Sequence, residues 1–173
     1  MYKYFSSSFS QVIFIAQVIF GVIGLTIASQ INIPLQPVPI NMGTIAVMLI
    51  GMQYSFPAAF NSSIIYLLLG IAGAPLFNNF SGGIVYFSGP TGGYLLGYFL
   101  AASVMSFLQD RRYIKSLILL CVIGQLMIFS TGMLWLAYLK DFAIAWQFGF
   151  IPFILPGICK ISILVSIVKI IRR

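Results

Sequence analysis

The stretch from Gly70 to Tyr94, GIAGAPLFNNFSGGIVYFSGPTGGY, decides the fold that the sequence predicts. Its many glycines, together with Pro75 and Pro90, exclude a regular helix. Between these breakers it carries more apolar bulk than a solvated loop, and long apolar segments flank it on both sides. Irregular backbone beside membrane spans is tolerated only where it is buried in protein or lines a cavity. We therefore predict that this stretch is a lid over a binding site.

The composition of the whole chain is that of a multi-span membrane protein. Of the 173 residues, 61% are hydrophobic and 6% are charged, and the mean hydropathy is +1.07, which excludes an ordinary soluble domain. Nine Lys and Arg residues stand against two acidic ones. Because the basic residues lie at the ends of apolar runs, they indicate membrane topology rather than nucleic-acid binding. The expected partner is the lipid bilayer, with no nucleic acid.

Residues for catalysis and metal binding are nearly absent. The sequence contains no histidine, and its two acidic residues, Asp110 and Asp141, lie beside basic residues in expected loops. It contains no paired carboxylates, zinc-ligand spacing or GxxxxGK[ST] phosphate loop. Cys121 and Cys159 lie singly in apolar runs, where they are expected to pack as small hydrophobic residues. We therefore predict no enzyme, no catalytic, metal or cofactor site, and no ATPase activity in this chain.

Six apolar segments predict an all-α integral membrane protein with six transmembrane helices, forming one substrate-binding domain over residues 1–173. A cleaved signal peptide is the alternative for the first segment. The second segment, capped by Asn41, is about 20 Å long and too short for a hydrocarbon core of about 30 Å. The extended INIPLQPVPI segment (31–40), with three prolines, is expected to complete that crossing. The predicted helices are 12–28, 41–53, 57–69, 91–108, 116–138 and 150–170.

The basic residues predict the orientation in the cell membrane. Six spans place both termini on one side, together with Lys3, Arg111, Arg112, Lys115, Lys169, Arg172 and Arg173. Lys140 falls on the opposite side. The positive-inside rule therefore predicts cytoplasmic N and C termini and an extracytoplasmic loop between the third and fourth helices. Trp135 and Trp146 are interpreted as anchors at the outer interface.

The first predicted helix carries a face of small residues. Gly24 and Ala28 form a small-xxx-small pair, and Gly21 lies on nearly the same face. Such a face lets another helix approach closely. That helix belongs either to this chain or to a partner subunit, and the sequence leaves both alternatives open.

Lys160 is the charge that an apolar span should not contain. It lies about ten residues into the sixth predicted helix, where a lysine costs roughly 2.5–3.5 kcal/mol on insertion scales. One interpretation is that its ammonium reaches the outer interface along its own stem. The other is that Lys160 faces a cavity, where an anionic or strongly hydrogen-bonding ligand balances its charge, because no acidic residue lies in any span.

Further ligand-binding candidates lie in and beside the central stretch. Asn78 and Asn79 offer amide donors and acceptors for a polar head group. Tyr86, Phe87 and Tyr94 are candidates for the wall around an apolar body. Together with Lys160, they suit a small molecule that has a polar ring system or carboxylate and an apolar stem.

The chain resembles the BioY family, the substrate-binding S component of energy-coupling factor (ECF) biotin transporters. The resemblance rests on several short segments in a fixed order. These are IPLQPVPI (33–40), YLLLGIAGAPLF (66–77), SGG (81–83), GPTGGYLLGY (89–98) and GQLMIFSTGMLWL (124–136). In the last segment, Phe129 stands where the family has a tyrosine.

The resemblance implies a six-helix subunit that captures biotin from outside. A transmembrane coupling subunit and two ABC-type ATPases would then drive its delivery inward. These partners are expected to dock on the first helix, at Gly21, Gly24 and Ala28. The alternatives are an S component for another small vitamin, or a membrane scaffold protein without transport activity.

The resemblance also assigns site residues. The family's loop asparagine falls on Asn79, with Asn78 as the adjacent alternative, and its lysine falls on Lys160. The aspartate of the family pattern PGDxxK has no counterpart in this chain, where the segment reads PGICK (156–160). Gly43 stands where the family has a glutamine, and Asn41 replaces a threonine.

Overall fold

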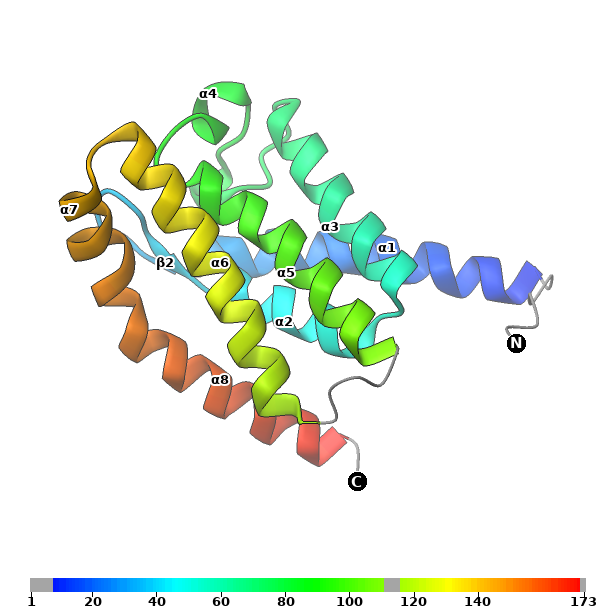
Figure 1. Cartoon of the computed structure of the whole chain (residues 1–173). Coiled ribbons are helices and arrows are strands. Elements are labelled where there is room, and N and C mark those ends of the chain that lie inside the picture. The colour runs from blue at the N-terminus through cyan, green and yellow to red at the C-terminus, as the bar shows by residue number, and fades with distance from the viewer. Residues whose placement is uncertain (1–7, 111–115, 172–173) are drawn as a thin grey trace.

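The computed structural model describes residues 8–110 and 116–171, which fold into a bundle of helices (Figure 1). A two-stranded hairpin follows the first helix, and short helical turns interrupt the long connections. The elements in chain order are α1 (Ser8–Gln30), β1 (Asn32–Ile33), β2 (Ile40–Asn41), α2 (Gly43–Gln53), α3 (Phe56–Ile71), the 3-10 turn η1 (Asn78–Phe80), α4 (Ile84–Phe87), α5 (Gly92–Asp110), α6 (Leu117–Leu139), α7 (Phe142–Ile144), the π-helical segment η2 (Ala145–Phe150) and α8 (Ile151–Ile171).

Four stretches of helix within the described residues are long and apolar enough to cross a membrane. They cover residues 10–30, 92–109, 117–139 and 142–166, the last running from α7 through η2 into α8. Helices α2 and α3 are apolar but shorter, with 11 and 16 residues. At 1.5 Å per residue they reach about 16 and 24 Å, less than a hydrocarbon core of about 30 Å. The architecture is that of a multi-pass membrane protein.

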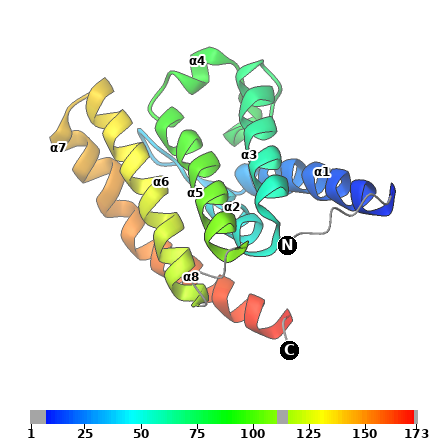
Figure 2. The same cartoon turned by 45° about the vertical axis from the view of Figure 1, so that its right-hand side comes forward.

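Helix α5 lies at the centre of the bundle, packed against α6, α2 and α3 (Figures 1 and 2). Small residues make the contact between α5 and α6 close. A side-chain carbon added to Gly93 would overlap Trp135, and one added to Gly132 would overlap Tyr94. Backbone approach at glycines is a common way to pack helices in membranes, where lipid gives no hydrophobic drive for association. This contact brings Tyr94 toward the interior of the bundle.

The proline-rich segment between α1 and α2 is extended, as predicted. Its ends pair as antiparallel strands, with Asn32 opposite Asn41 and Ile33 opposite Ile40. The prediction that Asn41 caps α2 is wrong by one residue, because Asn41 belongs to β2 and Met42 holds the cap position. The side chain of Asn41 instead accepts a hydrogen bond from Gly43 N at 3.0 Å.

Helix α1 packs on α3 and α2 through its second half, while its first half projects from the bundle (Figures 1 and 2). Gly21 is a contact within the chain, since an added side-chain carbon there would lie 2.6 Å from Ser62 Cβ. Gly21 therefore packs within the chain, which is the first of the two alternatives that the sequence leaves open. Gly24 differs, because no described atom lies within 4 Å of the same position. Ala28 is half-buried.

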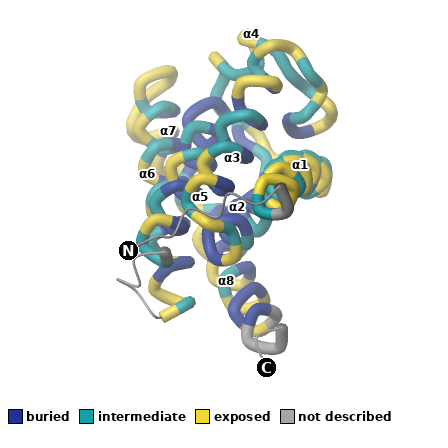
Figure 3. The backbone as a smooth tube through the Cα atoms, turned by 90° about the vertical axis from the view of Figure 1, so that its right-hand side faces the viewer, coloured by how far each residue is buried: buried dark blue, intermediate teal, exposed yellow. Residues whose placement is uncertain are grey.

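The segment between α3 and α5, residues 72–91, is irregular apart from η1 and α4, as predicted. Hydrogen bonds fasten one part of it to the end of α1. Gln30 Nε2 donates to Phe77 O at 3.1 Å and to Leu76 O at 3.4 Å, and Gln30 Oε1 accepts from Phe80 N at 2.9 Å. The outer surface around α4 is exposed (Figure 3). The segment is therefore a cover held at a few points rather than a packed helix.

Trp135 fastens the other end of this cover to α6. Its Nε1 donates to Gly89 O at 3.0 Å, and its ring packs against Phe87 with 5.9 Å between ring centroids. Trp135, which the sequence predicts to lie at the outer interface, is half-buried and ties the cover to α6. Trp146 is 46% exposed and stacks on Phe150.

Candidate functional site

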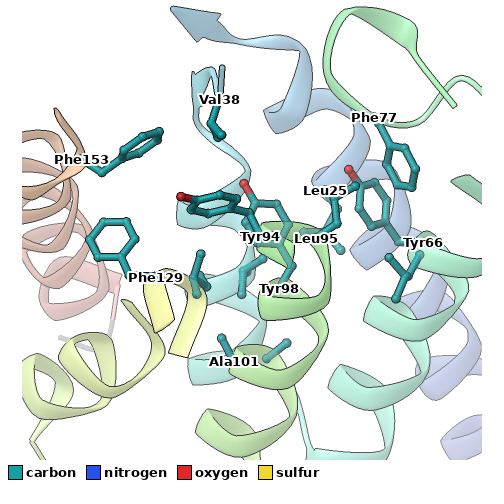
Figure 4. Close-up of a cluster of buried hydrophobic side chains, with 14 of the residues drawn as sticks. Leu25, Val38, Tyr66, Phe77, Tyr94, Leu95, Tyr98, Ala101, Phe129 and Phe153 are labelled. Carbon is teal, nitrogen blue, oxygen red and sulfur yellow. The ribbon is translucent and has the colours of Figure 1, made fainter. Parts of the chain in front are cut away.

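A cavity lies where α5, α6 and α8 meet the hairpin and the cover segment. The cavity is narrow: its own volume is about 40 Å³, within a space of about 580 Å³ that includes the open mouth. Aromatic rings form much of the wall. Figure 4 shows Phe129 and Phe153 on one side of Tyr94, and Tyr66 with Phe77 on the other. The lining residues are Ser29, Val38, Pro39, Asn41, Thr44, Tyr66, Asn78, Tyr86, Thr91, Tyr94, Leu95, Tyr98, Gln125, Ile128, Phe129, Phe153, Pro156, Gly157 and Lys160.

Lys160 points into this cavity. Its side chain is 8% exposed, and its Nζ donates to Asn41 O and, at 3.0 Å, to Thr44 Oγ1. The interpretation that Lys160 reaches the outer interface is therefore wrong. Helix α8 continues through Pro156, so the lysine stays one turn deeper than the proline. An ammonium has three N–H donors, and two of them bond to the protein here.

The charge of Lys160 has no acidic partner in the cavity. None of the described residues that line it is an aspartate or a glutamate. Asn41, which accepts from Lys160 through its backbone oxygen, is itself held by a hydrogen bond from Tyr98 Oη to Asn41 Oδ1 at 2.6 Å. Neutral dipoles therefore fix the position of the ammonium without neutralising it. A buried charge of this kind favours a ligand that brings negative charge or a strong acceptor.

Asn78 lies on the cavity at the side of the cover segment. It is 7% exposed, and its Oδ1 is buried without a hydrogen-bond partner among the described residues. Tyr86 of α4 lies beside Asn78 and Thr91, and all three residues line the cavity. Burial raises the pKa of Tyr86 above its usual value, so its hydroxyl stays neutral. This side of the cavity therefore offers neutral hydrogen-bonding groups.

Two of the predicted binding residues lie outside this cavity. Asn79 is exposed, and its Oδ1 accepts a hydrogen bond from Asn32 Nδ2 at 3.0 Å. Its backbone has a positive φ of 54°, which turns the chain between Asn78 and Asn79. Phe87 is half-buried against Trp135 and is absent from the cavity wall. The structure thus brings together Lys160, Asn78, Tyr86 and Tyr94, but not Asn79 and Phe87.

The mouth of the cavity lies between the hairpin and the cover segment. A shallower pocket on the outside is lined by hairpin residues 34–37 and by Asn79, Val85, Gly89 and Pro90. It shares Pro39, Asn78, Tyr86 and Thr91 with the deeper cavity. The two hollows are therefore adjacent, and Asn78 lies on the boundary between them.

Sequence reasoning missed several lining residues. Gln125 of α6 is 7% exposed and contributes a buried Oε1 that has no partner among the described residues. Thr44 holds Lys160, and Tyr66, Tyr98, Phe129 and Phe153 complete the aromatic wall. A signal for Gln125 was present, because it is the one carboxamide in the apolar run 117–139.

The comparisons with known proteins agree with this architecture. The model of the BioY family matches residues 4–173. A relative from Rickettsia prowazekii, named a probable biotin transporter BioY, is 36% identical over 165 residues, covering 92% of this chain and 84% of the relative. A second relative with that name, from Pyrococcus horikoshii, is 35% identical over 83% of this chain and 86% of its own length.

A solved structure shares the fold. It is a crystal structure of the S component for biotin from an ECF-type ABC transporter. It superposes with a TM-score of 0.84 at 21% identity, covering 96% of this chain and 94% of that one. The relatives bear the name of a transporter, which agrees with the prediction that the chain is not an enzyme. Because the family model and both relatives match over most of their length, the chain belongs to the BioY family.

Proposed function

We propose that this chain is the biotin-binding subunit of a vitamin uptake transporter. It captures biotin from the outside and delivers it inward with an energy-coupling module. The names of the relatives and of the fold match support the choice of ligand. The observation that carries the proposal is the buried Lys160 ammonium, which lines a cavity with no carboxylate among its described residues.

The chemistry of the cavity fits biotin. Biotin has a carboxylate, a ureido ring with one carbonyl and two N–H groups, and an apolar bicyclic body with an alkyl chain. Lys160 supplies a charged donor for an oxygen of the ligand, and Asn78 supplies an unpaired acceptor. Tyr86 and Tyr94 enclose the apolar body. Asn79 and Phe87 support the cover segment from outside the cavity.

The proposal includes six membrane crossings with cytoplasmic termini. Helix α2 then completes its crossing together with the extended segment 31–40. The end of α5, the start of α6 and the end of α8 lie at one end of the bundle, and α4 lies at the other (Figure 1). The basic cluster Arg111, Arg112 and Lys115 falls outside the described residues, in the connection at the first of these ends. The positive-inside rule puts this end in the cytoplasm, so the mouth opens outward.

The energy for transport comes from partners in this proposal. A transmembrane coupling subunit and two ABC-type ATPases hydrolyse ATP, because the chain has no phosphate-binding loop. The coupling subunit docks on α1 beside Gly24 and Ala28. A groove there is lined by Phe20, Gly24, Ala46, Leu49 and Tyr54, among others. Gly21 also lines this groove, and it packs against Ser62 as well.

Binding of labelled biotin to the purified protein tests this function. The expected result is that tritiated biotin is retained in detergent, displaced by unlabelled biotin and not displaced by thiamin or riboflavin. If thiamin or riboflavin displaces the tritiated biotin, the site is not specific for biotin, and the alternative of an S component for another vitamin holds. If no vitamin is retained and other membrane proteins co-purify stably, the scaffold alternative holds and the proposal fails.

A further inference from the structure

Gln125 has the environment of a ligand-binding residue rather than a packing residue. It lies in the middle of α6, is more than nine-tenths buried, and lines the cavity. Other polar side chains of this helix bond to its own backbone, as Ser130 does to Met127 O at 3.1 Å and Thr131 does to the same oxygen at 2.8 Å. The Oε1 atom of Gln125 has no such partner among the described residues.

A buried carboxamide oxygen without a partner is destabilising, because it loses its hydrogen bonds to water and gains none. The aliphatic residues around it in α6 would fill the same space at no such cost. Structures keep groups of this kind where they serve a site. Since Gln125 lines the cavity, a donor that enters the cavity can supply the missing partner.

The position of Gln125 places its carboxamide beside α8, the helix that carries Lys160. A side-chain carbon added to Gly157 would lie 3.6 Å from Gln125 Cδ, an ordinary van der Waals contact. Lys160 is three residues further along the same helix, about one turn away. The cavity wall therefore combines a charged donor from α8 and a neutral carboxamide from α6.

We propose that Gln125 Oε1 accepts a hydrogen bond from an N–H group of the bound ligand and so selects ligands that carry such a donor. The inference rests on the proposed function. In biotin the ureido ring carries the N–H groups, so the ring contacts Gln125. The acceptor is a neutral amide, so it leaves the charge of Lys160 free for an oxygen of the ligand.

A comparison of ligands with and without each N–H group tests this role. The probes are biotin and its two singly N-methylated ureido isomers, measured with the wild-type protein and with Gln125→Met, which keeps the side-chain length. Gln125→Met is expected to weaken biotin binding roughly tenfold, the range of one lost hydrogen bond. For one isomer, the ratio of its Kd to that of biotin should fall by a similar factor in the variant.

A packing role would weaken all three ligands equally and leave both ratios unchanged, which would overturn the inference. Ser130→Ala is the matched control, because Ser130 is exposed on the same helix and is absent from the cavity wall. If Gln125→Met does not fold, Gln125→Leu provides the same comparison. A wild-type protein that retains no biotin overturns the proposed function. A wild-type protein that binds biotin with unchanged ratios in the variant overturns the role of Gln125 alone.

Discussion

Replacing Lys160 by methionine should separate binding from folding. The ammonium donates two of its three N–H groups to Asn41 O and Thr44 Oγ1, which leaves one donor for the ligand. A hydrogen bond to a charged group contributes about 1.5–3 kcal/mol, so its loss should raise the Kd for biotin about 10- to 150-fold. The fold should not suffer in the same way, because an apolar side chain of similar length removes a buried charge that has no acidic partner.

Two measurements on the same preparations check this expectation. Equilibrium dialysis with tritiated biotin gives the Kd, and thermal unfolding in detergent gives the Tm with and without biotin. In Lys160→Met the Tm without ligand should be unchanged or higher, while the increase that biotin produces should shrink as the affinity falls. Lys140→Met is the matched control, because Lys140 is exposed at the end of α6. It should change neither quantity.

The reasoning fails if Lys160→Met binds biotin with nearly the wild-type affinity. It also fails if the Tm without ligand drops sharply, since the lysine would then be a structural residue. Biotin methyl ester identifies the ligand atom that Lys160 contacts. If the carboxylate is the partner, the ester binds more weakly than biotin in the wild type and equally well in Lys160→Met. If the ureido carbonyl is the partner, the ratio of the two affinities is the same in both proteins.

Four further substitutions test other parts of the proposal. Asn78→Leu should weaken biotin binding about tenfold by removing an acceptor, whereas Asn79→Leu should leave it nearly unchanged; the reverse order in equilibrium dialysis would move the site to the outer pocket. Gln30→Met removes the hydrogen bonds to Leu76, Phe77 and Phe80, so bound biotin should dissociate faster in a filter-binding chase, and an unchanged rate would show that these bonds do not hold the cover. Gly24→Leu fills space that no described atom occupies within 4 Å, so binding by the isolated protein should persist while biotin uptake by cells that supply the coupling module falls; normal uptake would exclude docking at this groove.

The helices could be predicted from the sequence because their limits follow from local chemistry. Prolines and glycines set the ends of the apolar runs, and Pro57 lies in the first turn of α3 as predicted. The fourth predicted helix, 91–108, corresponds to α5 at Gly92–Asp110. The prediction that Asn41 caps α2 was less accurate. Asn41 pairs with Asn32 across the hairpin, so α2 begins only at Gly43. Such pairing depends on contacts that a local pattern does not contain.

The site was harder to predict at single-residue precision. Asn78 and Asn79 are equivalent by composition, and the positive φ of 54° at both Asn79 and Phe80 decides which amide turns inward. Tyr86 and Phe87 are neighbours in one turn of helix, where side chains diverge by about 100°. One of them therefore faces the cavity and the other faces Trp135. The sequence therefore predicts that such a segment lines a site, but the local backbone conformation determines which of its side chains face the cavity.

The attachment of the cover segment gives α1 a direct influence on the site. Gln30 is the last residue of α1, and it holds the backbone of residues 76–80 through the hydrogen bonds that flank Asn78. Ser29, the residue before it, bonds to Tyr66 Oη at 2.9 Å in the cavity wall. The side chains of Ser29 and Gln30 reach only a few ångströms. A displacement of α1 relative to α3 therefore either breaks these hydrogen bonds or moves the cover segment with the helix. The helix proposed to meet the coupling subunit is therefore the helix whose last two residues hold the cover segment and the cavity wall.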